Sequence, residues 1–312
     1  MVYVSSIKEA KWGGTMKRKR LLFVLNPQAG KGEIRPKLLP VIERFTAAGY
    51  DTTVVPTKQA GELPDTVERL GAAADLVVCC GGDGTLNETV TGLMRLEQPP
   101  PLGYLPTGTS NDFAAGLGIP HDLEAAAEKV VRGTPFDCDV GLFCHRYFTY
   151  IAAFGAFTDV SYQTPQQTKH WLGHTAYILE GIKRLPGLKS YHVSIQYDGG
   201  QCEGDYLFGM ISNATSIGGM KLLPETAHVA MNDGEFEVVL IHNPHSLPEA
   251  QRVINAVLMH DLSSPLITAF HTAHITLRCT DAEMPWTLDG EYGGAPELVE
   301  IQNLRLGLRI ML

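Results

Sequence analysis

A strand that runs straight into a glycine turn and a helix constrains this chain more than any other stretch. Residues 76–80 are uninterruptedly apolar, which is typical of a strand buried in a parallel sheet. The turn 81–84 follows, and Thr85 and Glu88 then have capping-box spacing at a helix start. Glycines let phosphate oxygens approach the backbone, and free helix N–H groups attract negative charge. The pattern predicts a phosphate site, with an ordinary tight turn as the alternative.

The same order of strand and helix recurs throughout the first half of the chain. Repeated β-α units imply a parallel sheet with helices on both faces. Ligands of such sheets lie at the carboxyl ends of the strands, so the loops that follow them should converge. We expect strands at 21–25, 52–55, 76–80 and 102–105, and helices at 38–48, 64–70, 85–96 and 122–132.

Beyond Phe136, strand-like runs predominate and predict a second, antiparallel β-rich domain. The strands are expected at 137–143, 147–154, 191–197, 205–212, 228–230, 236–241, 271–277 and 298–301, with helices near 171–185 and 248–259. The expected organisation is an extension at 1–15, an α/β domain at 16–136 and a β-sandwich domain at 137–303. The apolar segment 304–312 either closes the second domain or returns to the first.

Length, charge and cysteines exclude several classes of protein. The 312 residues suit two domains, and no apolar run is long enough to span a membrane. A net charge of −9 argues against nucleic-acid binding, despite a basic cluster at 17–20. Six cysteines without a C-x-x-C pair indicate reduced thiols and a cytoplasmic location. His170 and His174 have zinc-pair spacing, but Trp171 stands where a zincin has glutamate, so a metal is not favoured there.

Two further loops follow strands of the predicted parallel sheet. Residues 107–113 read Thr-Gly-Thr-Ser-Asn-Asp-Phe; their hydroxyls can reach phosphate oxygens, and Asp112 can hold a metal-bound water. A helix cap by Ser110 or Asn111 is the alternative reading. Residues 26–32 resemble half of a P-loop and include Lys31, but lack the Gly-Lys-Ser/Thr ending. Taken alone they are a weak signal, which predicts a phosphate contact through backbone N–H groups and Lys31.

Two aspartate-glycine pairs mark the β-rich half. In Asp-Gly-Glu at 289–291, Asp289 or Glu291 can serve as the base that takes a proton from a hydroxyl nucleophile. The same dipeptide is the strongest hairpin signal, and spacing alone favours a turn. The pair at 233–234 is equally open between a hairpin turn and a cation site built from oxygen donors.

Together these segments resemble the diacylglycerol kinase catalytic family of soluble bacterial lipid kinases. Segments 26–32, 81–88, 106–114 and 288–291 occur in family order. The Gly-Gly-Asp-Gly-Thr motif alone is shared with NAD kinases and resembles phosphofructokinases, whereas Gly-Thr-Ser-Asn-Asp-Phe-Ala is closer to the lipid-kinase branch. The resemblance implies an α/β domain of the NAD-kinase and phosphofructokinase type, a β-sandwich domain that takes the lipid, and an active site between them.

The resemblance also implies ATP and Mg²⁺ as cofactors, diacylglycerol as the acceptor and phosphatidic acid as the product. Glu291 would be the general base, with Asp83 as a second catalytic residue. Asp112 and Asp139 would lie near Mg²⁺ and its waters, and a structural Mg²⁺ would bind Asp233 and backbone carbonyls near Ala230 and Glu235. Nucleotide contacts are implied at Asn26, Thr57, Gly81, Gly82, Gly84, Thr85, Asn87, Glu88, Thr107, Thr109 and Asn111.

The chain departs from the family pattern at two places. Glu235 stands where an apolar residue is usual, and 218–220 is poorer in glycine. A lipid acceptor implies peripheral contact with a membrane surface, for which 171–185 is either an interfacial helix or a helix packed on the β-rich domain. The oligomeric state is left open between a monomer and a homodimer.

Two alternatives to a diacylglycerol kinase are kept. One is a kinase of another acceptor, NAD or a sphingoid lipid; the lipid-kinase-type segment at 107–113 argues against NAD. The other is a non-catalytic regulator that binds nucleotide or lipid. The presence of Asp83, Asp112 and Glu291 argues against that loss of activity.

Overall fold

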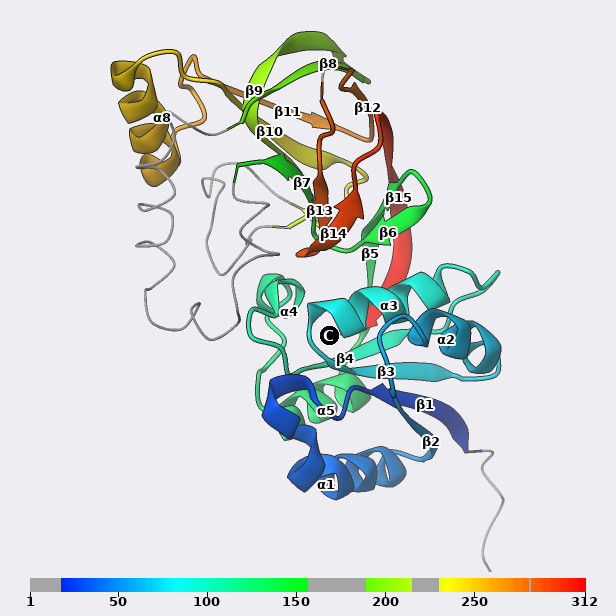
Figure 1. Cartoon of the computed structure of the whole chain (residues 1–312). Helices are drawn as coiled ribbons and strands as arrows, with labels where there is room; N and C mark the ends of the chain where they lie inside the picture. Colours follow the sequence, from blue (N-terminus) through cyan, green and yellow to red (C-terminus); the bar gives the residue numbers. More distant parts are fainter. Residues whose placement is uncertain (1–17, 157–188, 215–229, 281) are drawn as a thin grey trace, which may run out of the picture.

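The computed structural model describes residues 18–156, 189–214, 230–280 and 282–312. Within these ranges the chain forms an α/β domain and a β-rich domain, hereafter the β domain (Figure 1). The predicted helix at 171–185, the pair His170 and His174, and the loop at 218–220 lie outside the described residues. The same holds for most of the strand expected at 228–230.

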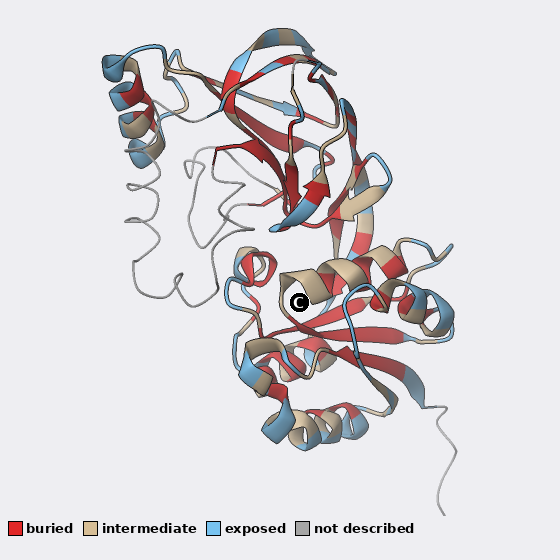
Figure 2. Cartoon of the chain, in the orientation of Figure 1, coloured by how far each residue is buried: buried red, intermediate tan, exposed pale blue. Residues whose placement is uncertain are grey.

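A parallel sheet forms the centre of the α/β domain, as predicted. Its inner strands β3 and β4 are buried along their whole length because helices cover both faces (Figure 2). In spatial order the strands are β2 (Tyr50–Pro56), β1 (Lys19–Leu25), β3 (Leu76–Gly81) and β4 (Leu102–Pro106). On one face α1 (Ile34–Ala47) packs against α5 (Leu123–Arg132), and on the other α2 (Leu63–Gly71) packs against α3 (Asp83–Leu93) (Figure 1).

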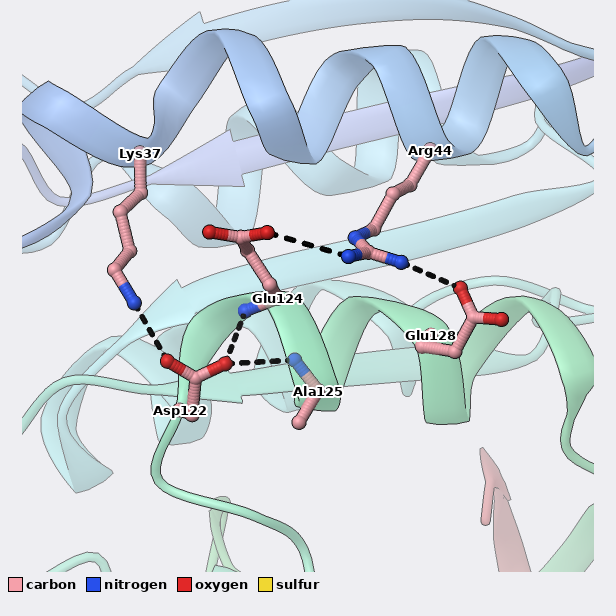
Figure 3. A network of polar contacts seen from close by, with 6 residues as sticks. All are labelled: Lys37, Arg44, Asp122, Glu124, Ala125 and Glu128. Carbon is pink, nitrogen blue, oxygen red and sulfur yellow. Dashed lines mark hydrogen bonds and ion pairs between the residues drawn. The ribbon is translucent and has the colours of Figure 1, made fainter.

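Ion pairs join α1 to α5 on the outside of this domain (Figure 3). Arg44 contacts Glu124 at 3.2 Å and Glu128 at 2.8 Å. Lys37 contacts Asp122 at 2.5 Å. Asp122 also caps α5, as predicted, by accepting hydrogen bonds from two backbone N–H groups of its first turn. These side chains are partly exposed, so the pairs orient the helices while the apolar core beneath supplies most of the stability.

Two helices begin earlier than the sequence predicted. Helix α3 starts at Asp83 with Gly82 as its N-cap, so the expected capping box at Thr85 is wrong. Thr85 lies within the first turns of the helix and packs on Gly81, where an added Cβ would come within 2.4 Å of it. Helix α1 starts at Ile34 and not at residue 38, because Pro36 falls in its first turn, where no N–H is needed.

The β domain is an antiparallel sheet that curls around an aromatic core. The rings of Phe143 and Phe154 lie 5.1 and 4.9 Å from that of Trp286. Helix α8 (Leu247–Met259) packs on its outer end through Ala250 and Leu207. The strands are β5 (Pro135–Phe143), β6 (Arg146–Phe148), β7 (Ile151–Gly155), β8 (Tyr191–Tyr197), β9 (Gly200–Ser212), β10 (Phe236–His242), β11 (Ile267–Thr272), β12 (His274–Arg278), β13 (Trp286–Leu288), β14 (Glu291–Gly294) and β15 (Leu298–Met311). The predicted fold class is confirmed.

Two predicted strands are each divided where backbone N–H groups donate to an aspartate elsewhere in the chain. The run 147–154 is interrupted between β6 and β7, where the N–H groups of Thr149 and Tyr150 donate to Asp289. The run 271–277 is interrupted between β11 and β12, where Ala273 and His274 donate their N–H groups to Asp198. Each aspartate takes the hydrogen bonds that a continuous strand would use.

Strands β5 and β15 run antiparallel through both domains and connect them (Figure 1). The predicted segments 298–301 and 304–312 are therefore one strand, whose end Ile310 pairs with Leu102 of β4. A bulge between Leu304 and Leu308 marks the passage from one domain to the other. Within that bulge Leu306 has a φ of 53°, and its N–H donates to Asp139 at 2.7 Å.

Candidate active site

The three glycine-bearing loops meet at the carboxyl edge of the parallel sheet, as predicted. A Cβ added to Gly108 would lie 2.6 Å from the Cα of Gly82, so the loops after β3 and β4 are in backbone contact. A Cβ on Gly30, whose φ is +56°, would lie 2.4 Å from the carbonyl oxygen of Thr107. No larger residue fits at these contacts. The result is a surface of bare backbone at the N-terminus of α3, which suits bound phosphate.

Asn111 shapes the second of these loops. It has a left-handed backbone, with φ 51°, and does not cap α4 (Asp112–Gly116) with its side chain. Its side chain instead accepts from the N–H of Gly108 at 2.8 Å and donates to the carbonyl of Gly108 at 2.7 Å. The helix-cap alternative is therefore wrong for Asn111, whose side chain closes the loop and leaves Thr109 exposed at its tip.

Asp83 has one oxygen engaged and one available. Its Oδ2 accepts the backbone N–H of Asn111 at 2.9 Å, while its Oδ1 is buried without a hydrogen-bond partner. Burial, and then the charges of Asp112 and Asp289, raise the pKa of Asp83 to about 7. A buried acid in this condition is stabilised by any cation or donor that reaches its free oxygen.

These acids fit Mg²⁺ only in combination with a ligand. In the described part of the chain, no group of three or more His, Cys, Asp or Glu side chains is placed to hold a metal ion. Mg²⁺ in nucleotide sites is usually bound by one or two carboxylates, together with phosphate oxygens and water. The unpartnered Oδ1 of Asp83, close enough to Asp112 to feel its charge, meets that requirement.

The turn between β13 and β14 is the predicted hairpin. Asp289 and Gly290 both have positive φ, 48° and 83°, as a type I′ turn requires. The carboxylate of Asp289 is 3 % exposed, and burial raises its pKa. Its two oxygens accept hydrogen bonds from Asn87 Nδ2, Thr149 N, Thr149 Oγ1, Tyr150 N and Ile151 N, at 2.7–3.1 Å. Asp289 is therefore a structural residue, which leaves Glu291 as the candidate base.

Glu291 lies at the boundary between the domains. Its side chain is exposed, and its Oε1 is 3.3 Å from the position of a Cβ on Gly84, in the first turn of α3. Asn87, also on α3, donates to Asp289 at 2.8 Å and to the carbonyl of Tyr147 at 3.0 Å. Asn87 was predicted to contact nucleotide, but the structure shows its amide fastening the hairpin of the β domain to α3.

Other predicted nucleotide residues support the neighbouring loops. Glu88 accepts the N–H groups of Gly61 at 2.8 Å and Leu63 at 3.4 Å, and so holds the loop after β2. Thr57 is half-buried at the start of that loop. Asn26 accepts the N–H of Gln28 at 2.9 Å and thereby forms the first turn after β1. The side chains of Asn26 and Glu88 are thus engaged within the protein.

The residues predicted for a second Mg²⁺ lie at the domain junction. Asp139 accepts N–H groups from Gly234 and Leu306, both at 2.7 Å, with one oxygen each. Asp233 accepts the N–H of Glu235 at 3.0 Å. The segment 230–235 and Asp139 are thus brought together, but their carboxylates bond to backbone. Coordination of Mg²⁺ there stays a prediction.

Sequence reasoning missed two residues of this site. Thr149 binds Asp289 through both its N–H and its hydroxyl, and Tyr150 adds a buried phenol beside the same turn. The adjacent pair Thr149-Tyr150, which places two hydroxyl groups in the middle of the largely apolar run 147–154, was the available signal. The partner of that pair lies about 140 positions away, so no local pattern could identify it.

Comparison with known proteins agrees with this arrangement. Residues 20–143 match the diacylglycerol kinase catalytic domain, and residues 153–308 match the YegS C-terminal NAD kinase beta sandwich-like domain. The diacylglycerol kinase of Bacillus subtilis (strain 168) is 35% identical over 282 residues, covering 89% of this chain and 91% of the relative. The chain belongs to the diacylglycerol kinase family.

A second curated relative and a solved structure are also similar to this kinase. The diacylglycerol kinase of Staphylococcus aureus (strain MRSA252) is 31% identical over 279 residues, covering 89% of this kinase and 87% of the relative. A crystal structure of a putative diacylglycerol kinase from Bacillus anthracis str. Sterne has the same fold, with a TM-score of 0.81 and 24% identity over 97% of this chain and 98% of that one. Membership makes the chain a phosphotransferase. None of its described helices is both long and apolar enough to cross a membrane.

Proposed function

We propose that this kinase transfers the γ-phosphoryl group of ATP to the primary hydroxyl of sn-1,2-diacylglycerol and yields phosphatidic acid. The observation that carries the proposal is the approach of Glu291 from the β domain to the first turn of α3. There a carboxylate base stands next to a phosphate-type backbone loop. Phosphoryl transfer to an alcohol requires both parts.

The α/β domain supplies the phosphate side of this site. The loops at Gly82 and Gly108 let phosphate oxygens approach backbone N–H groups, and the start of α3 adds the positive end of its dipole. Bound Mg²⁺ supplies charge neutralisation of the phosphates. Asp83 and Asp112 would hold it, and the free oxygen of Asp83 supports this role.

The β domain supplies the base. As the lipid oxygen forms its bond to the γ-phosphorus, the bond from that phosphorus to the β-γ bridging oxygen breaks and ADP leaves. The hydroxyl proton passes to the exposed carboxylate of Glu291. Asp289 fixes the turn that carries Glu291, and Asn87 fixes that turn against α3. Because the acceptor resides in a bilayer, the proposal includes peripheral contact with the membrane surface on the cytoplasmic side.

The test is ATP-dependent phosphate transfer, with Mg²⁺, to diacylglycerol in mixed micelles, with NAD and sphingosine run in parallel. We expect phosphatidic acid as the product, and a fall in kcat of about 10²–10⁴-fold in Glu291→Gln. Glu297→Gln, the same change at an exposed position of the β domain, should keep wild-type turnover. Full activity of Glu291→Gln would show that the assigned base is wrong. Transfer to NAD or sphingosine alone would move the assignment to that acceptor.

A further inference from the structure

Tyr150 has a fixed backbone at the edge of the candidate site. It lies between β6 and β7 and is 5 % exposed. Its N–H donates to Asp289 at 3.0 Å. Its carbonyl accepts from the hydroxyl of Ser212 at 3.2 Å and the N–H of Asn213 at 3.0 Å. Because both its N–H and its carbonyl are hydrogen-bonded, the backbone of Tyr150 holds the Cα that carries the phenol in place.

The Tyr150 hydroxyl lies beside the turn that carries Glu291. Its oxygen is 3.9 Å from the position of a Cβ on Gly290, the residue directly before Glu291. Burial, and then the charges of Asp289, Asp83 and Asp112, hold the pKa of Tyr150 well above its usual range. The phenol therefore keeps its proton and is a neutral hydrogen-bond donor in a site lined by carboxylates.

This donor has no partner among the described residues. The hydrogen bonds of Tyr150 within those ranges all involve its backbone. Its oxygen is not one of the fully buried, unpartnered side-chain atoms of the described residues, so it is open enough for solvent or a ligand to supply the hydrogen bond that a tyrosine hydroxyl normally makes. Tyr104 differs: its hydroxyl has two acceptors within hydrogen-bond distance, the carbonyl of Gly81 at 3.2 Å and Oδ1 of Asn111 at 3.4 Å. The Tyr150 hydroxyl is therefore available to a ligand.

We propose that the Tyr150 hydroxyl donates a hydrogen bond to an ester carbonyl of the acceptor glycerolipid and so positions its primary hydroxyl against Glu291. This assignment rests on the proposed function. Tyr150 belongs to the β domain, on the side of the base, whereas the phosphate-type loops belong to the α/β domain. An ionised carboxylate only accepts hydrogen bonds, so the surrounding acids cannot donate one to a carbonyl oxygen. A neutral phenol supplies the donor that such an oxygen needs.

The test compares a diester glycerolipid with its diether analogue, which lacks the carbonyl oxygens. Both are presented in mixed micelles to the full-length wild type, Tyr150→Phe and Tyr104→Phe. We expect the wild type to favour the diester by about tenfold in kcat/KM, which corresponds to one hydrogen bond. Tyr150→Phe should lose that preference through a higher KM for the diester, with its KM for ATP within about twofold of wild type. Tyr104→Phe should keep the preference and raise the KM for ATP.

Each other result overturns the assignment in a recognisable way. If Tyr150→Phe lowered kcat/KM equally for the diester and the diether, Tyr150 would have a structural role only. A raised KM for ATP in Tyr150→Phe would give the hydroxyl a phosphate partner. A wild type that phosphorylates neither lipid would overturn the proposed function, and the role of Tyr150 with it. Thermal unfolding of both variants identifies any loss of fold.

Discussion

The same dipeptide, Asp-Gly, occurs on both sides of the domain boundary and serves two purposes. Asp83-Gly84 opens α3 in the α/β domain, and Asp289-Gly290 turns the hairpin of the β domain. Asp83 keeps one buried oxygen without a partner, whereas both oxygens of Asp289 are engaged by five donors. Hydrogen-bond supply, and not the dipeptide itself, therefore separates an acid with a free oxygen from one that is fully engaged.

The backbone around each aspartate explains the difference. At Asp83 the surrounding amides belong to a helix start, and the N–H of Asn111 donates to one carboxylate oxygen while the other has no partner among the described residues. At Asp289 the left-handed turn directs the side chain toward three successive N–H groups at 149–151. Burial raises the pKa of both acids, but at Asp289 these hydrogen bonds oppose the rise. Asp83 is thus left with a free oxygen, whereas the oxygens of Asp289 are fully engaged.

The largest effect we expect is on the activity of Asp83→Asn. Removal of this charge should lower kcat/KM about 10³-fold, because the phosphate side of the site loses the carboxylate placed for Mg²⁺. The fold should remain, since only one backbone hydrogen bond of Asp83 is involved. Steady-state phosphate transfer, with circular dichroism as the fold control, measures this. If Asp83→Asn kept wild-type kcat/KM, Asp83 would not be needed for phosphate transfer, and the free oxygen that separates it from Asp289 would have no functional meaning.

The second effect is on the stability of Asp289→Ala. Five donors in a buried site would lose their acceptor, and we expect the free energy of unfolding to fall by about 3–5 kcal/mol. Urea denaturation followed by circular dichroism checks this value. Asp233→Ala is the matched control, because that exposed side chain makes one local hydrogen bond, and little change is expected there. Equal stability of the two variants would contradict the structural role of Asp289.

The third effect is the pH dependence of stability that the raised pKa of Asp83 should produce. An aspartate loses its proton near pH 4 in the unfolded chain, but Asp83 does so near 7 in the folded one. Between these values the folded state binds more protons, so the contribution of Asp83 to stability falls as pH rises from about 4 to 7. Without nucleotide or Mg²⁺, Asp83→Asn should therefore be more stable than wild type at pH 8, by about 2–4 kcal/mol, and similar to it near pH 4. Chemical unfolding at both pH values tests the sign; a constant difference between them would refute it.

The smallest effect is expected for the exposed ion pairs between α1 and α5. Arg44→Ala removes contacts to Glu124 and Glu128, yet the melting temperature should fall by no more than about 2–3 °C. Thermal unfolding at low and high salt measures this, and the difference should shrink as salt increases. A larger, salt-independent loss would mean that these charges matter as much as the buried hydrogen bonds of Asp289.

Several features of the fold follow from neighbouring residues alone. The apolar runs that become β3 and β4, the glycine loops after them, the cap at Asp122 and the Asp289-Gly290 hairpin were all predicted. Each depends on interactions within a few residues: strand burial, backbone freedom at glycine, or a side chain bonded to the next turn. Such signals are readable because their donors and acceptors lie side by side in the sequence.

Other features were decided by contacts between distant segments. Asn87 and Asp289 are 202 positions apart, and Thr149 lies 140 positions from the same carboxylate. Their hydrogen bonds ended the predicted strand at 147–154 and excluded Asp289 as the base. Likewise Glu88, expected in a capping box with Thr85, bonds to the loop after β2, and α3 starts at Asp83.

The sequence by itself therefore determined the two-domain fold class, the family and the edge of the sheet where phosphate-type loops gather. Only the tertiary structure decided which acid beside a glycine has a free oxygen and which is fully engaged, and brought Tyr150 beside the turn that precedes Glu291. The physical reason is that a buried carboxylate takes its role from the number of donors that reach it. That number depends on which segments, distant in the sequence, the fold brings together.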